Sequence, residues 1–285
     1  MGVGRRLAGL ARLTHPFPSL LNGAVTAAFA LLAGATPATA GRLGIAMVSL
    51  QAAIGALNDL VDAPRDAGLK PGKPIPAGLV SPVTARLVVL GGAALGIGLS
   101  MPSGPATTAV ALFGLVIGGL YDLRFKGTPW SWLPFALGIP LLPVYAWLGV
   151  TGRLPAAFAI LVPAAALAGA ALAIANALAD VERDRAAGTR SVATRLAPRL
   201  AWAAHAGLHA GLVALAVGGL VWLGPSRPPA LAVVGLAVGG LLLAAGLVMT
   251  AGPGPRRREW GWELEAAGIG VLGASWVAAV VLDNA

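Results

Sequence analysis

The chain has 285 residues, of which 57% are hydrophobic and 11% are charged, and its mean hydropathy is +0.81. Ordinary soluble domains carry about 25% charged residues, so this composition excludes a soluble globular protein. The sequence has no cysteine, which excludes disulfides and thiolate chemistry, and its net charge of +9 comes from basic residues that flank apolar segments. The expected partner of these charges is therefore an anionic lipid leaflet, and a nucleic acid is not expected.

Nine apolar segments follow one another along the chain, and most can span a bilayer, some with the help of interfacial residues at their ends. They are Pro18–Ala35, Leu43–Leu57, Thr84–Met101, Ala106–Tyr121, Trp132–Val150, Ala156–Ala179, Leu200–Leu223, Ala230–Thr250 and Leu264–Leu282. Proline, glycine or charged residues mark the breaks between them. The pattern predicts an all-α, multi-pass membrane protein that forms a single domain over residues 1–285.

The distribution of basic residues predicts how the chain is oriented in the membrane. With nine spans, the N-terminus and the loops after the second, fourth, sixth and eighth segments lie on one side. That side receives all of the 20 Lys and Arg residues except Arg42, Arg153 and Arg227. Because cytoplasmic loops are enriched in Lys and Arg, we expect a cytoplasmic N-terminus, cytoplasmic Asp-rich loops and an external C-terminus.

The first of two acidic clusters lies at the end of the second apolar segment. It contains Asn58, Asp59, Asp62 and Asp66. The three acids are separated by three and four residues, so a helix places them on one face, where they repel one another unless a cation lies between them. Pro64 is expected to disturb the helix after Asp62, so that Asp66 reaches inward from a loop.

The second cluster ends the sixth segment and contains Asn176, Asp180 and Asp184, again at a spacing of four. Four segments separate the two clusters, which predicts two similar four-helix halves and a ninth helix. Amide and carboxylate oxygens suit Mg²⁺, which is commonly shared with a diphosphate. For either cluster alone, an acidic helix end neutralised by nearby arginines is the alternative.

Basic residues follow both clusters and the fourth segment, and such residues can bind diphosphate oxygens. They are Lys70, Lys73, Arg190, Arg195, Arg124 and Lys126. We favour Lys73 and Lys126 as substrate contacts, although each cation alone also fits a role in membrane orientation.

These motifs resemble the UbiA superfamily of intramembrane prenyltransferases, which includes 4-hydroxybenzoate polyprenyltransferases. The matching positions are Asn58-Asp59-x-x-Asp62-x-x-x-Asp66, the run from Lys70 to Gly78, the loop from Tyr121 to Lys126, and Asp180-x-x-x-Asp184-x-x-x-Gly188. The resemblance covers nearly the whole chain. It implies a nine-helix enzyme that binds an isoprenyl diphosphate through two Mg²⁺ ions and transfers the prenyl group through an allylic carbocation. The acceptor in this family is often aromatic or a quinone precursor; chlorophyllide, haem and glycerophosphate lipids are others.

The resulting prediction divides the site residues among three roles. The expected metal ligands are Asn58, Asp59, Asp62, Asp66, Asp180 and Asp184, of which Asp62, Asp66, Asp180 and Asp184 are the expected catalytic residues. The expected diphosphate contacts are Arg65, Lys70, Lys73, Tyr121 and Lys126, and the expected acceptor contacts are Asn22, Arg124 and Asn176. Many relatives carry Arg where this chain has Lys73, which keeps the charge but loses bidentate geometry.

Two other functions are compatible with these features. A UbiA-type membrane terpene cyclase would use the same metal site but quench the carbocation internally. A non-enzymatic transporter is less favoured, because the acids lie near the cytoplasmic ends of the spans and not at the bilayer midplane, where a cation relay is expected.

A few polar residues lie outside these motifs. His205 and His209 are one helical turn apart, but no acid lies near them in the sequence, so we expect a structural role and not a zinc site. His15 is expected at the membrane interface. Glu263 and Glu265 are expected in solvent or in ion pairs.

Overall fold

The computed structural model of the chain describes residues 3–68 and 72–281, and within these ranges the ordered elements are all helical. The helices form two compact units. The first unit comprises Met1–Arg124 and Pro143–Gly152, and the second comprises Phe125–Leu142 and Arg153–Ala285. One predicted site residue, Lys70, lies outside the described residues, as does the end of the ninth predicted segment.

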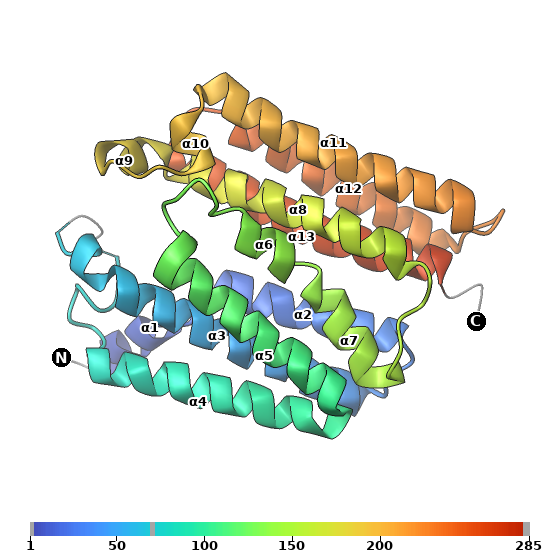
Figure 1. Cartoon of the computed structure of the whole chain (residues 1–285), viewed down its shortest axis with the longest axis horizontal. Helices are drawn as coiled ribbons and strands as arrows, with labels where there is room; N and C mark the ends of the chain where they lie inside the picture. The colour runs from blue at the N-terminus through green and yellow to red at the C-terminus, as the bar shows by residue number, and fades with distance from the viewer. Residues whose placement is uncertain (1–2, 69–71, 282–285) are drawn as a thin grey trace. The chain divides into compact units, whose positions relative to one another are not determined.

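The first unit is built from α1 (Val3–Leu13), α2 (Pro16–Leu32), α3 (Pro37–Asp66), α4 (Pro82–Ser100), α5 (Pro105–Leu120) and most of α7 (Leu141–Thr151). In Figure 1, α2 to α5 run alongside one another in blue to green, with α3 packed against both α2 and α4. Each of α2 to α5 has proline in its first turn, where the missing N–H costs no helical hydrogen bond. Thr36 and Ser81 cap α3 and α4 by accepting from Thr39 N at 3.2 Å and Thr84 N at 3.0 Å.

Helix α3 is longer than the apolar segment that predicted it. It continues through the whole first acidic cluster and ends at Asp66, with Pro64 inside the helix. The expectation that Pro64 would move Asp66 into a loop is therefore wrong. Pro64 lies in the last turn, where the loss of one hydrogen bond does not prevent the helix from closing.

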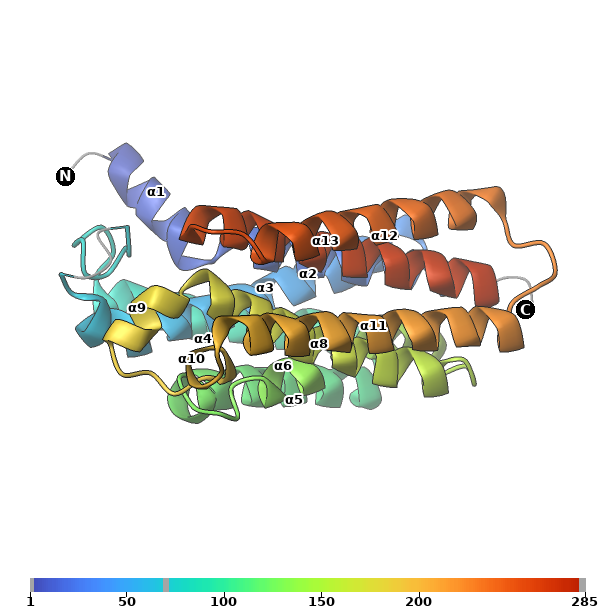
Figure 2. The same ribbon diagram turned by 90° about the horizontal axis from the view of Figure 1, so that it is seen from above.

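The second unit contains α6 (Leu133–Gly138), α8 (Phe158–Ala179), α9 (Val181–Ala186), α10 (Val192–Arg195), α11 (Pro198–Leu223), α12 (Ala230–Thr250) and α13 (Pro255–Val280). Figures 1 and 2 show α11 alongside α8, and α12 alongside α13. The contact between α12 and α13 depends on glycine. A Cβ atom at Gly239 would lie 2.8 Å from Leu272 N, and one at Gly261 would lie 2.9 Å from Gly246 O. Such close backbone approach is typical of helices that associate in lipid.

Eight of the described helical segments are long and apolar enough to cross a membrane. A further apolar helix, α2, has 17 residues. Each predicted apolar segment thus corresponds to a helical region. The fifth segment differs from the expectation, because it is divided into α6 and α7 at Ile139 and Pro140. Proline lacks the N–H that would continue the helix and disfavours helical geometry in the residue before it.

Candidate metal and diphosphate site

The first acidic cluster is buried at the end of α3. Asp59, Asp62 and Asp66 have exposed fractions of 2%, 6% and 6%. Their spacing of three and four residues on one continuous helix places them on one face, as predicted. Carboxylates are seldom buried without a compensating charge, so this face of α3 needs cations.

Two basic side chains of the first unit contact Asp59. His15 Nε2 lies 3.0 Å from Asp59 Oδ1, and Lys73 forms an ion pair with the same oxygen. His15 caps the start of α2 with φ at 48°, a left-handed conformation that is strained for a non-glycine residue. This turn between α1 and α2 aims the imidazole at the carboxylate. The prediction that His15 lies at the membrane interface did not include this contact with Asp59.

The structure adds Asp122 to the first cluster. Asp122 lies in the π-helical turn η2 (Tyr121–Phe125) after α5, and its exposed fraction is 4%. Its Oδ1 accepts a hydrogen bond of 2.6 Å from Asn58 Nδ2. Asp122 was not among the predicted site residues. One signal for it was present, because Asp122 directly follows an apolar segment on the same predicted side as the other acids.

The atoms of this cluster fit a hard divalent cation such as Mg²⁺. Asp59 Oδ2 is buried and has no hydrogen-bond partner among the described residues. The amide nitrogen of Asn58 is used by Asp122, which leaves the amide oxygen as an acceptor toward a cation. Buried oxygen donors of this kind match the ligand preference of Mg²⁺.

The remaining predicted residues of the first unit lie on three of its elements and differ in exposure. Arg65 is exposed on the last turn of α3, and Arg124 is exposed in η2. Tyr121 opens η2 and is half-buried, and Asn22 is half-buried on α2. No described contact joins Arg65 or Asn22 to the carboxylates.

The second cluster lies where α8 passes into α9 in the second unit. Asn176 is in α8, Asp180 is the junction residue, and Asp184 is in α9. The single helix expected for this motif is thus interrupted at Asp180, which has φ −106° and ψ 9°. A helical hydrogen bond nevertheless joins the two acids, since Asp184 N donates to Asp180 O at 2.9 Å. Arg183 forms an ion pair of 3.2 Å with Asp180 in which both side chains are more than 40% exposed, so it contributes little stability.

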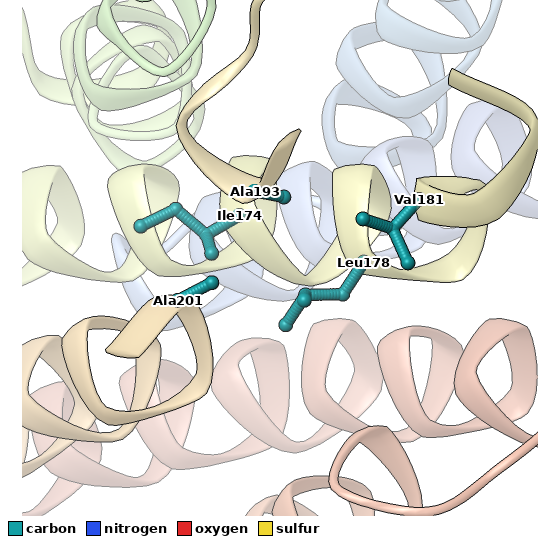
Figure 3. Packing of buried hydrophobic residues seen from close by; sticks show 5 residues of the cluster. All are labelled: Ile174, Leu178, Val181, Ala193 and Ala201. Atoms are coloured by element: carbon teal, nitrogen blue, oxygen red, sulfur yellow. The ribbon is translucent and has the colours of Figure 1, made fainter. Parts of the chain in front are cut away.

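A small hydrophobic cluster holds this junction together (Figure 3). It contains Ile174 and Leu178 from α8, Val181 from α9, Ala193 from α10 and Ala201 from α11, all buried. The cluster packs the end of α8 against the first turns of the next three helices. Apolar packing therefore fixes the backbone around Asp180 at the junction of α8 and α9.

The loop that contains Lys126 lies beside the segment that follows the second cluster. Arg190 N donates a hydrogen bond of 3.0 Å to Gly127 O, and Thr189 N donates one of 2.9 Å to Asp184 O. Gly127 has φ at 73°, which favours glycine at this turn. The fold thus brings the predicted diphosphate residue Lys126 to the same part of the second unit as Asp184, a relation that sequence spacing did not indicate.

The fold and these clusters define a class of protein. It is a multi-pass helical membrane protein with buried carboxylates and flanking basic residues at the ends of apolar helices. A family model described as the UbiA prenyltransferase family matches residues 19–262. The chain belongs to the UbiA prenyltransferase family.

Among the curated proteins similar in sequence to this chain are two that are named digeranylgeranylglyceryl phosphate synthase. The protein from Methanopyrus kandleri is 34% identical over 140 residues, which cover 48% of this chain and 50% of that protein. The protein from Natronomonas pharaonis is 31% identical over 192 residues, which cover 66% of this chain and 68% of that protein. The match with the first of these relatives thus spans only half of its length.

Solved structures of UbiA homologues share the fold. The apo structure of the homologue from Aeropyrum pernix K1 has a TM-score of 0.75 and 22% identity, and the match covers 90% of this chain and 96% of that one. The homologue from Archaeoglobus fulgidus bound to DMAPP and Mg²⁺ has a TM-score of 0.66 and 21% identity, with 93% and 99% covered.

Replacing Asp122 by alanine is expected to weaken Mg²⁺ binding about 10- to 100-fold, because Asn58 loses the partner that orients its amide. Asp122→Asn keeps an oxygen acceptor and should lose less. Calorimetric titration of the purified protein with Mg²⁺ measures both variants. Equal affinities for Asp122→Ala and wild type would show that Asp122 has no part in the site.

Proposed function

We propose that this protein transfers a prenyl group from an isoprenyl diphosphate to a lipid acceptor. The observation that carries the proposal is the buried stack of Asp59, Asp62 and Asp66 on α3, with Lys73 in contact with Asp59. A buried oxygen cluster with an adjacent cation is suited to hold a divalent metal and the diphosphate that shares it. Membership of the UbiA prenyltransferase family supports the same reaction.

In this proposal the acidic residues of both clusters are metal ligands. Asn58, Asp59, Asp62, Asp66, Asp180 and Asp184 would hold Mg²⁺, and Asp59 also contacts His15 and Lys73. When bound, Mg²⁺ would offset the negative charge of the departing diphosphate. A related structure bound to DMAPP and Mg²⁺ supports the choice of metal and donor, and two ions remain the expected number.

The basic residues bind and orient the diphosphate. Lys73 and Lys126 donate to its oxygens, and Tyr121, Arg65 and Lys70 are further candidates. The allylic C–O bond breaks, and the diphosphate leaves with the electron pair. The apolar helices exclude water from the resulting carbocation. An acceptor oxygen or carbon then forms the new bond and loses its proton.

We propose a glyceryl phosphate lipid as the acceptor, in place of the aromatic acceptor favoured by the sequence analysis. Both curated relatives named above are digeranylgeranylglyceryl phosphate synthases. The name of these relatives describes a glyceryl phosphate with two geranylgeranyl groups. Such a product forms when a second geranylgeranyl group is added to a glyceryl phosphate that already carries one. Arg124, Asn22 and Asn176 are the candidate contacts, and the exposed guanidinium of Arg124 suits the acceptor phosphate.

The basic residues also support an orientation for the proposed enzyme. Their asymmetry favours a cytoplasmic N-terminus, cytoplasmic acidic clusters and an external C-terminus. The charged diphosphate head group of the donor and Mg²⁺ would then reach the clusters from the cytoplasm.

The test uses purified full-length protein with geranylgeranyl diphosphate and Mg²⁺. The acceptors offered are geranylgeranylglyceryl phosphate, 4-hydroxybenzoate or none, and the products are analysed by mass spectrometry. The expected result is an ether product with the glyceryl phosphate only, abolished by EDTA. A prenylated hydroxybenzoate would restore the aromatic acceptor. A cyclic hydrocarbon formed without acceptor would identify a terpene cyclase, and no reaction with any acceptor would contradict the proposal.

A further inference from the structure

The second unit contains a buried polar cluster that has no part in the proposed reaction. His205 and His209 on α11 and Glu265 on α13 have exposed fractions of 0%, 1% and 0%. Of the two alternatives expected for Glu265, exposure to solvent is wrong, and its partners are these histidines, whereas Arg258 pairs with Glu182. No acid lies near the two histidines in the sequence, but the fold brings Glu265, which is 60 residues after His205, into contact with them. Ionisable groups inside a membrane bundle are costly to bury, which makes such a cluster a candidate functional site.

Three ligand atoms of this cluster converge on one point. His205 Nε2 lies 2.8 Å from Glu265 Oε2, His209 Nε2 lies 3.2 Å from the same oxygen, and the two Nε2 atoms are 3.1 Å apart. These distances form a closed triangle with nearly equal sides. A tetrahedral Zn²⁺ with bonds of about 2.0–2.1 Å separates its ligand atoms by about 3.3 Å. The three separations are therefore within about 0.5 Å of the spacing of three corners of a zinc tetrahedron.

With an ionised Glu265, hydrogen bonds alone do not satisfy all three sides of this triangle. If both imidazoles carry a proton on Nε2 and donate to Glu265, their two N–H groups face one another at 3.1 Å. If one Nε2 is unprotonated, its lone pair faces a lone pair of the carboxylate. A cation at the common point interacts favourably with all three atoms.

We propose that His205, His209 and Glu265 bind a divalent transition-metal ion of the Zn²⁺ type. Two imidazole nitrogens and one carboxylate oxygen suit zinc, whereas Mg²⁺ prefers oxygen ligands only. Three protein ligands leave a fourth position open to water. The ion joins α11 to α13, and the site contains none of the aspartates assigned to Mg²⁺.

The surroundings of the cluster hold the carboxylate in place. The Thr250 hydroxyl on α12 lies 3.2 Å from Glu265 Oε1, the carboxylate oxygen that does not face the histidines. A Cβ atom at Gly246 would lie 2.5 Å from Glu265 Cγ, so glycine provides the space for this side chain. The Nδ1 atoms of both imidazoles are buried without a hydrogen-bond partner among the described residues, so the contacts at Nε2 orient the rings.

The test is titration of EDTA-treated, full-length protein with Co²⁺ in the presence of excess Mg²⁺, followed by visible absorption. Co²⁺ replaces Zn²⁺ in tetrahedral sites and reports their geometry. We expect about one Co²⁺ per chain with a tetrahedral spectrum, displaced by Zn²⁺. Near-saturating Zn²⁺ should also raise the melting temperature of the wild type by about 5 to 10 °C.

Three variants separate this site from other metal binding. The spectrum should be lost in His209→Gln and retained in His15→Ala, which removes the remaining histidine of the chain, and in Asp62→Asn. If His209→Gln fails to fold, Co²⁺ binding by the wild type still decides. The proposal is overturned if the wild type gives no tetrahedral spectrum with saturating Co²⁺, or if the spectrum is unchanged in a folded His209→Gln protein.

Discussion

Asp62→Asn and Asp184→Asn are each expected to lower the rate of prenyl transfer by about a thousandfold or more. Each substitution replaces a carboxylate that would hold Mg²⁺ by a neutral amide of nearly the same shape. The lost charge stabilisation of the departing diphosphate is several kcal/mol, and about 4 kcal/mol corresponds to a thousandfold change in rate. The measurement is Mg²⁺-dependent release of diphosphate from geranylgeranyl diphosphate in the presence of the glyceryl phosphate acceptor.

The matched control is Glu259→Gln, which makes the same change at an exposed position on α13. It should keep the wild-type rate within about twofold. Raising the Mg²⁺ concentration should restore part of the activity of Asp62→Asn if the loss is one of metal affinity. A folded Asp62→Asn or Asp184→Asn protein with full activity would remove that cluster from the mechanism.

Gly169→Ala is expected to cause the largest loss of stability of any single methyl group added to the second unit. Gly169 is buried on α8, and a Cβ atom there would lie 2.2 Å from the carbonyl oxygen of Phe135 and 3.0 Å from Ala136 Cα on α6. Because these atoms belong to the backbone, α6 must move to accommodate the methyl group. We expect a loss of about 3 kcal/mol or more, and a melting temperature lowered by about 6 to 12 °C.

The control for this substitution is Gly240→Ala on α12. A Cβ atom at Gly240 has nothing within 4 Å in the described part of the chain, so the same methyl group should change the melting temperature by less than about 2 °C. Fluorescence-detected unfolding in one detergent compares both variants with the wild type. Similar melting temperatures for the two variants would show that α6 does not pack closely on α8.

The positions of the apolar helices were readable from hydropathy, because every backbone polar group in lipid must be paired within its own segment. The stacking of Asp59, Asp62 and Asp66 followed from helical periodicity in the same way, and α3 has the continuous helix that this stacking requires. Residue type and spacing predicted the ends and breaks of helices less well. Pro64 did not end α3, whereas Asp180, which carries no such signal, divides α8 from α9.

Only the tertiary structure decided which side chains meet. Asp59 contacts His15 across 44 residues, Asn58 donates to Asp122 across 64, and Glu265 reaches His205 across 60. Periodicity shows which face of a helix carries a polar residue, but it does not show which helix will lie against that face. The neighbours are chosen by close backbone packing, as at the glycines between α12 and α13, and that packing depends on the shapes of both surfaces at once.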